Sequence, residues 1–189
     1  MSLIVQKFGG SSVANPERVR NVAEIITDTY KAGNKVVVVV SAQGDTTDDL
    51  IEMAAQINDN PSKREMDVLL SSGEQISMSL LAMAIEKIGC PVVSLTGWQV
   101  GIKSTTHYGN AKIKRVDTER LEMELDKNNI IIVGLDDSWT GKWYNAQMIF
   151  NAQTDGSTSQ KALKTAMEIF EIQASRPAHG GPCNRQDQG

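Results

Sequence analysis

Cysteine and histidine are scarce in this sequence, and their scarcity excludes several classes of protein. Two cysteines, Cys90 and Cys183, are too few for a disulfide framework or a complete zinc site. Two histidines, His107 and His179, exclude a histidine-rich metal centre. Cys90 and His107 have no partners nearby in the sequence, so we expect both to be structural residues.

Clusters of positive charge and long apolar segments are also missing. The 189 residues include 19 Lys and Arg against 23 Asp and Glu, which gives a net charge of -4. A nucleic-acid-binding protein usually needs a basic face, so no nucleic-acid partner is expected. The longest apolar run, around residues 37–40, is too short to cross a bilayer, and the N-terminus lacks a signal-peptide pattern. These absences predict a cytoplasmic protein with no membrane partner.

Hydrophobic residues make up 40% of the chain, enough for one globular domain, and their spacing predicts an α/β fold. Residues 3–8 and 35–41 indicate strands, and a helix between them begins at Asn15, an N-cap, and Pro16. Val19, Val22, Ile25 and Ile26 share one face of that helix. The continuous valines of the second strand predict burial on both faces, as in a parallel sheet covered by helices.

The same alternation continues to about residue 134. A helix is predicted to begin at Thr46, with an apolar stripe that includes Met53 and Ile57, and a longer one at residues 62–88 is predicted to break near Gly73. Further strands are predicted at residues 90–95, 111–116 (a short edge strand) and 129–133, and helices at 118–125 and 159–171. Residues 175–189, rich in Gly, Pro, Gln and Asn, predict a disordered tail.

The end of the first predicted strand carries groups suited to phosphate. Lys7 supplies a positive charge, and Gly9 and Gly10 follow it directly. Glycine lets the backbone approach an anion so that successive N–H groups point at it, and Ser11 and Ser12 add hydroxyl groups. The alternative is an ordinary strand-to-helix turn with a surface lysine.

Other segments carry weaker signals. Residues 41–48 follow a buried strand, where α/β proteins bind ligands, although simple N-capping by Thr46 or Thr47 also explains them. Glu74, beside the predicted helix break, would suit the ammonium group of an amino acid or would face solvent. Residues 155–159 would form an anion turn or a helix cap. Trp98, Trp139 and Trp143 would stack on a base or pack in the core.

Taken together, these segments resemble the aspartokinases of the amino acid kinase family. The N-terminal signature is Lys7-Phe8-Gly9-Gly10-Ser11-Ser12-Val13, and further matches follow at residues 37–48, 65–67, 72–74, 82–86, 95–97, 109–111 and 131–133. Several motifs in the family's order are more specific than any one motif alone. The resemblance covers about the first 134 residues.

The resemblance implies a three-layer αβα sandwich with a mainly parallel sheet, and phosphoryl transfer from MgATP to the side-chain carboxylate of L-aspartate. It implies a role for eight residues. Lys7 would neutralise charge on the transferring phosphoryl group, Phe8, Gly9, Gly10 and Ser11 would hold ATP, Ser41 would lie near the nucleotide, and Thr47 and Glu74 would hold aspartate. ATP and its Mg²⁺ are the implied cofactors, and no metal site of the protein's own is expected.

The sequence departs from the family's pattern after Val133. The family's Gly-Arg-Gly-Gly-Ser-Asp segment is absent, and residues 155–159 are only a faint echo of it. We therefore expect residues 1–134 to be the N-terminal part of the kinase domain, 135–174 to diverge around one helix, and 175–189 to be a tail. Such a chain would be a truncated kinase of little activity, with its sheet incomplete on the C-terminal side.

Two alternatives remain open at this point. One is a non-catalytic fragment that associates with a full-length kinase subunit. The other is a different amino acid kinase that acts on another acidic substrate. Independently of these alternatives, the expected protein partner is a second copy of this chain, in a homo-oligomer, or a full-length subunit.

Overall fold

The computed structural model describes residues 2–106, 108 and 113–134. Its elements in chain order are β1 (Leu3–Phe8), a 3₁₀ turn η1 (Gly10–Val13), α1 (Pro16–Lys31), β2 (Lys35–Val40), α2 (Thr46–Ile57), α3 (Lys63–Ile88), β3 (Val92–Thr96), β4 (Ile102–Ser104), β5 (Ile113–Val116), α4 (Glu119–Asp126) and β6 (Ile130–Gly134). The helix predicted at 159–171, the turn at 155–159, the predicted tail, Trp139 and Trp143 lie outside the described residues.

A parallel four-stranded sheet with the order β1-β2-β6-β3 forms the centre of the fold. The two inner strands are the most apolar segments of the chain: residues 36–40 and 130–133 are all buried. Burial on both faces is what a continuous run of valine or isoleucine predicts. The parallel sheet expected from the sequence is therefore confirmed.

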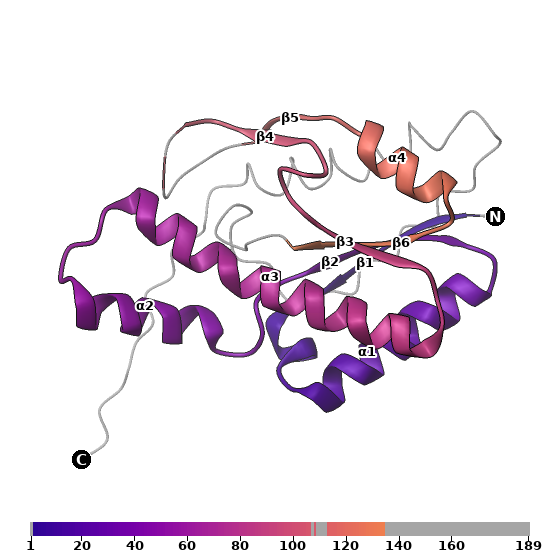
Figure 1. The fold of residues 1–189 in the computed structure, drawn as a ribbon, viewed down its shortest axis with the longest axis horizontal. Helices are drawn as coiled ribbons and strands as arrows, with labels where there is room; N and C mark the ends of the chain where they lie inside the picture. The colour runs from indigo at the N-terminus through magenta and orange to yellow at the C-terminus, as the bar shows by residue number, and fades with distance from the viewer. Residues whose placement is uncertain (1, 107, 109–112, 135–189) are drawn as a thin grey trace, which may run out of the picture.

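Helices α1 and α3 cover one face of the sheet, and helix α4 with the β4–β5 hairpin covers the other (Figure 1). The side chains between the sheet and its two covers form two separate apolar clusters. One joins the sheet to α1 and α3 and includes Phe8, Val38, Ile26, Leu81 and Ile132. The other joins it to α4 and the hairpin and includes Val5, Val37, Leu95, Leu121 and Val133. This layered α/β architecture agrees with the predicted fold class.

Helix α1 follows the prediction at its start and differs along its face. The side chain of Asn15 accepts a hydrogen bond from the backbone N–H of Arg18 at 2.9 Å, which caps the helix. Val19, Val22 and Ile26 are buried, but Ile25 is 44% exposed. Ile25 lies a quarter turn away from Ile26, outside the row that meets the sheet.

Helix α2 corrects the predicted apolar stripe. None of its residues is buried, and Met53 and Ile57 are 59% and 89% exposed. The helix packs along α3 and extends beyond the sheet (Figure 1), so its apolar side has no sheet to cover. Periodicity predicted the helix correctly but not its place in the fold.

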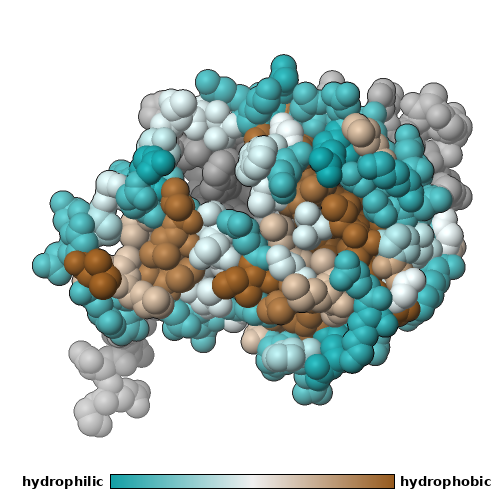
Figure 2. Space-filling model, in the orientation of Figure 1, coloured by the Kyte–Doolittle hydropathy of each residue, from teal (hydrophilic) through white to brown (hydrophobic). Residues whose placement is uncertain are grey.

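Helix α3 is continuous over 26 residues, so the predicted break at Gly73 is wrong. By length and composition it is the one helix of the described chain that could cross a bilayer, and 39% of its apolar window is buried. Leu81 and Ile85 pack in the core, and we therefore interpret α3 as a core helix. Apolar side chains remain on its outer side, over which Figure 2 shows brown patches: Ile76, Leu80 and Met83 are 49%, 42% and 60% exposed.

The strand predicted within residues 111–116 exists as β5, but it does not lie at the edge of the main sheet. It pairs antiparallel with β4 in a separate two-stranded sheet. The hairpin contributes Ile102 to the apolar cluster beneath α4. A short alternating segment needs a neighbour to pair with, and the sequence does not say which one.

A buried carboxylate fastens α4 to the turn that leads into β6. The Glu124 side chain is 6% exposed and accepts hydrogen bonds from Asn129 Nδ2, Arg120 Nε and Lys127 Nζ at 2.8, 3.0 and 3.2 Å. The hydrogen bond from Asn129, with those from the two cations, holds the pKa of Glu124 below its ordinary value. The charged form is therefore favoured by folding.

We expect this carboxylate to make stability depend on pH. A folded pKa below the unfolded one stabilises the protein at neutral pH, and the stabilisation is lost as pH falls through the folded pKa. Glu124→Gln should lower the free energy of unfolding by about 1.5–3 kcal/mol at pH 7. Urea unfolding at pH 7 and at pH 3 would measure the difference in the free energy of unfolding between variant and parent, which should be smaller at pH 3. An equal difference at both pH values would contradict the stabilising role of the Glu124 carboxylate.

Candidate active site

The carboxyl ends of β1, β2 and β6 meet at one edge of the sheet. Phe8 lies in register with Val40, and Val40 with Gly134. The glycines after β1 and the loop after β2 therefore begin side by side. In open α/β sheets ligands bind outside this edge, which makes it the candidate site.

The glycine turn after β1 lies directly on the loop after β2. Ser41 N donates to the carbonyl oxygen of Phe8 at 3.2 Å, and Gly44 N donates to that of Gly10 at 3.1 Å. A Cβ atom on Gly10 would lie 2.4 Å from the carbonyl oxygen of Ala42, closer than any side chain tolerates. Glycine is therefore required at position 10 by contact between two backbones.

Two side chains fasten this turn from either side. Gln43 Nε2 donates to the carbonyl oxygen of Val13 at 2.7 Å, at the end of η1. The Arg18 guanidinium, from the first turn of α1, donates to the carbonyl oxygen of Ser11. Ser11 itself is exposed, while Gly9 and Gly10 are half-buried. The turn thus has a fixed backbone with one hydroxyl side chain at the surface.

Lys7 and Phe8 leave β1 on opposite faces of the sheet. Phe8 is 7% exposed and packs in the cluster beneath α1 and α3, so only its main chain remains for a ligand. Lys7 is half-buried and lies two residues after Val5, so it shares the face of β1 on which Leu3 and Val5 pack toward α4. Its side chain therefore lies over the other face, one residue before the edge where the candidate site begins.

Glu74 is buried and reaches the loop after β2. It is 5% exposed, and its Oε1 accepts a hydrogen bond from Ala42 N at 3.1 Å. The alternative of a solvent-facing glutamate after a kink is therefore wrong. A carboxylate held by a backbone amide is fixed in direction as well as in place.

Small residues let α3 approach this closely. A Cβ on Gly73 would lie 2.9 Å from Ala42 Cβ, and one on Gly134 would lie 3.2 Å from the carbonyl oxygen of Glu74. Gly73 thus serves close packing of an unbroken helix rather than a break in it. The middle of α3, the end of β6 and the loop after β2 meet around Glu74.

The start of α2 differs from the predicted cap. Asp45 occupies the N-cap position without a side-chain hydrogen bond, so capping by Thr46 or Thr47 is wrong. A backbone turn closes the loop instead, with Thr46 N donating to the carbonyl oxygen of Gln43 at 2.9 Å. Ser41 is buried and Thr47 half-buried, and both belong to this loop region.

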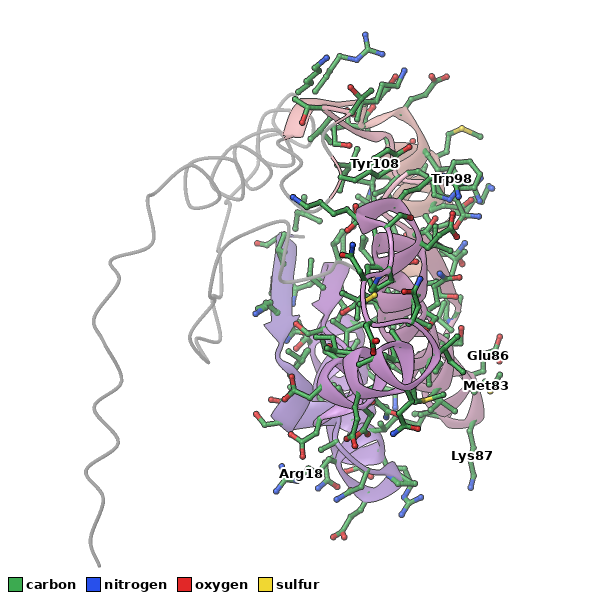
Figure 3. The ribbon with its side chains drawn as sticks, turned by 90° about the vertical axis from the view of Figure 1, so that its left-hand side faces the viewer. Arg18, Met83, Glu86, Lys87, Trp98 and Tyr108 are labelled. Carbon is green, nitrogen blue, oxygen red and sulfur yellow. The ribbon has the colours of Figure 1, made fainter. Side chains whose placement is uncertain are left out.

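Two further predicted residues lie outside the site. Cys90 is buried in the core, as expected for a structural cysteine. Trp98 follows β3 and is 76% exposed, so packing in the core is not its role. In Figure 3 Trp98 and Tyr108 lie at the end of the molecule away from Arg18, the residue that contacts the glycine turn. Trp98 therefore does not join that turn.

Several residues that build the site carried little signal in the sequence. Ala42 acts through its backbone N–H, and Gly134 through its lack of a side chain. Gln43 and Arg18 act through hydrogen bonds to carbonyl groups 30 and 7 residues away. Gly73, beside Glu74, was the one signal in the sequence for this part of the site, and it predicted a helix break instead.

Comparison with known proteins identifies the family of this chain. The model of the amino acid kinase family matches residues 2–157, which extends beyond residue 134. An aspartokinase of Geobacillus stearothermophilus is 53% identical over 133 residues, 70% of this chain and 33% of the relative. Aspartokinase 2 of Bacillus subtilis is 50% identical over 168 residues, 89% of this chain and 40% of the relative. This chain thus spans about a third to two fifths of the length of these relatives.

Solved structures show the same fold. The crystal structure of an aspartate kinase from Synechocystis matches with a TM-score of 0.62 and 39% identity, over 89% of this chain and 27% of that one. E. coli aspartokinase III in complex with aspartate and ADP matches with a TM-score of 0.56 at 17% identity, over 89% of this chain and 47% of that one. With its parallel sheet, its glycine turn and a family match over most of its length, this chain belongs to the amino acid kinase family.

Proposed function

We propose that this chain carries the nucleotide- and aspartate-binding part of an aspartate kinase. The reaction would transfer the γ-phosphoryl group of ATP to the side-chain carboxylate of L-aspartate and give 4-phospho-L-aspartate and ADP. The observation that carries the proposal is the meeting of the glycine turn and Glu74 at one sheet edge through Ala42. The similarity to aspartokinases that are about 50% identical in sequence supports the proposal.

The nucleotide would lie on the glycine turn. Phosphoryl transfer needs positioning and charge neutralisation more than covalent help from the protein. The N–H groups of Gly9 and Gly10 and the hydroxyl of Ser11 would bind phosphate oxygens, with Ser41 nearby. Lys7 would neutralise charge as an aspartate oxygen bonds to the γ-phosphorus and the bond to the ADP oxygen breaks.

Magnesium would come with the nucleotide. The described residues include no group of three or more His, Cys, Asp or Glu side chains that could hold a metal ion. A donor set of backbone amides and a lysine fits phosphate oxygens, not a cation. Mg²⁺ on the phosphates would neutralise part of their charge, while the protein holds the phosphates themselves.

Aspartate would bind beside the nucleotide. The Glu74 carboxylate, directed by its bond to Ala42 N, would hold the α-ammonium group. The Thr47 hydroxyl, in the first turn of α2, would hold a substrate oxygen. The product is an activated carboxylate for lysine, threonine, methionine and diaminopimelate biosynthesis, and its water-soluble substrates fit a cytoplasmic location.

Binding and turnover test the proposal separately. Calorimetric titration with MgADP should show binding, and the hydroxamate assay for aspartyl phosphate should show low turnover. We expect low turnover because the sequence has no Gly-Arg-Gly-Gly-Ser-Asp segment. If the chain binds no MgADP, the proposal is wrong. A panel of acidic substrates would detect another amino acid kinase activity, and co-elution with an intact aspartokinase would detect a partner role.

Glu74→Gln tests the aspartate site. The amide oxygen of glutamine can still accept from Ala42 N, so the fold should be kept while the charge is lost. We expect aspartate to bind about 10-fold to 100-fold more weakly, as befits a lost charge-assisted hydrogen bond, and MgADP to bind as before. Glu86→Gln, an exposed change on the same helix, is the matched control. Equal aspartate affinity in both variants would remove Glu74 from the site.

A further inference from the structure

We propose that Gln43 is a positioning residue that locks the phosphate-binding turn to the loop held by Glu74. Its place in catalysis rests on the proposed function, whereas its effect on the two loops does not. The side-chain amide joins segments 30 residues apart, at a distance of 2.7 Å between Nε2 and the carbonyl oxygen of Val13.

The acceptor is well placed to act as an anchor. Val13 ends the 3₁₀ turn and is fully buried, so its carbonyl group is fixed by the core. Carbonyl groups at the end of a helical turn lack partners within the turn and need an outside donor. Gln43 supplies that donor from the neighbouring loop.

On its own loop, Gln43 stands between the contacts that define the site. Ala42 N donates to Glu74, and Gly44 N donates to the carbonyl oxygen of Gly10. The carbonyl oxygen of Gln43 itself accepts from Thr46 N, which closes the turn into α2. A shift of Gln43 would therefore move the Glu74 contact and the Gly10 contact together.

Arg18 cannot replace this link. Its guanidinium fastens the same turn to α1 through Ser11, and it makes no connection to the loop after β2. Arg18 is also exposed, so water competes for its hydrogen bond. Gln43 thus provides a side-chain connection between the groups proposed to hold the phosphates and those proposed to hold aspartate.

The consequence is a requirement for alignment. Phosphoryl transfer depends on the acceptor oxygen and the phosphorus being held in line, and a misplacement of about 1 Å can cost about 100-fold in rate. Loss of the Gln43 donor should therefore lower turnover more than it lowers nucleotide affinity.

Three variants separate the donor from the shape of the side chain. Gln43→Met keeps the length of the side chain and removes the donor, and Gln43→Lys restores a donor on a flexible stem. Gln75→Met is the matched control, because Gln75 Nε2 donates to the Ser71 carbonyl oxygen within α3. Gln75→Met makes the same chemical change in the side chain but leaves the hydrogen bond between Gln43 and Val13 in place.

Amide hydrogen exchange in the full chain tests the link without any ligand. Gln43→Met should speed exchange at Ser41 and Gly44 together by about five-fold to ten-fold, the worth of one hydrogen bond. Gln43→Lys and Gln75→Met should leave both rates near the parent's. If Gln43→Met leaves both rates unchanged, or changes one without the other, the positioning role is overturned.

Turnover and affinity then test the catalytic consequence. In the hydroxamate assay Gln43→Met should lose at least about ten-fold in turnover, while its affinity for MgADP changes less than about two-fold. Gln43→Lys should recover most of the loss. Equal turnover in Gln43→Met and Gln75→Met would overturn the catalytic part. A parent chain that binds no MgADP would instead count against the proposed function, and hydrogen exchange would still decide the link.

Discussion

Replacing Gly10 by alanine is expected to abolish MgADP binding and to lower the free energy of unfolding by about 1–3 kcal/mol. The added Cβ would lie 2.4 Å from the carbonyl oxygen of Ala42. A backbone carbonyl cannot turn aside as the end of a flexible side chain can, so the two loops must separate. Their separation would displace Gly44 from Gly10 and disturb the Glu74 contact to Ala42 N. Calorimetric titration and urea unfolding measure the two effects.

Gly33→Ala is the control that separates binding from stability. Gly33 has a φ of +87° and no neighbour within 4 Å of its added Cβ, so alanine there strains the backbone without a collision. We expect it to lower stability and leave MgADP binding intact. Should Gly10→Ala bind MgADP as the parent does, the close approach of the two loops would not matter for the site.

Replacing Lys7 by alanine is expected to lower turnover by about 10²-fold to 10³-fold, the usual cost of one lost electrostatic contact to the transferring group. The same change should weaken MgADP binding by about ten-fold, because phosphate oxygens lose a cation. Lys7→Arg keeps the charge on a longer, planar head and should recover binding better than turnover. The hydroxamate assay and calorimetric titration measure both.

Lys35→Ala provides the comparison for Lys7. Lys35 begins β2 at the amino edge of the sheet, where its Nζ lies 3.1 Å from Asp126 Oδ1. The residue type and the strand setting are alike, but Lys35 lies at the opposite edge from the site. A similar loss of MgADP affinity in both variants would mean that general charge, not the place of Lys7, attracts the nucleotide.

The site owes its shape to close approach rather than to any one side chain. Gly10 lies on Ala42, Gly73 on Ala42, and Gly134 on Glu74. These small residues bring the middle of α3 and the ends of β1, β2 and β6 to one point. A larger residue at any of these positions would push apart the segments proposed to hold ATP and those proposed to hold aspartate.

Much of the fold could be predicted from local pattern. Strands β1, β2 and β6 were expected within a residue or so of where they lie, because continuous valine and isoleucine mark strands buried on both faces. Asn15 and Pro16 predicted the start of α1, because capping is decided within one turn. The candidate Lys7 could be found for the same reason, since a lysine followed by two glycines is itself a local pattern.

What failed depended on contacts between distant residues. Periodicity gave α2 an apolar stripe, but whether that stripe is buried depends on α2 extending past the sheet. From composition, Gly73 predicted a break in the helix. In the structure it allows close packing against Ala42, which is 31 positions away in the chain. The link from Gln43 to Val13 left no local signal, because any polar residue is acceptable in a loop until its partner is known.

By itself, then, the sequence determined the strands, the helix starts and the glycine turn after β1, because these follow from preferences that act within a few residues. Only the tertiary structure decided that Glu74 faces inward, that α3 runs unbroken past Gly134, and that Gln43 joins the two loops. Those outcomes depend on which backbone segments come into van der Waals contact once the sheet has formed. The spacing of residues in the sequence does not indicate which distant segments will meet.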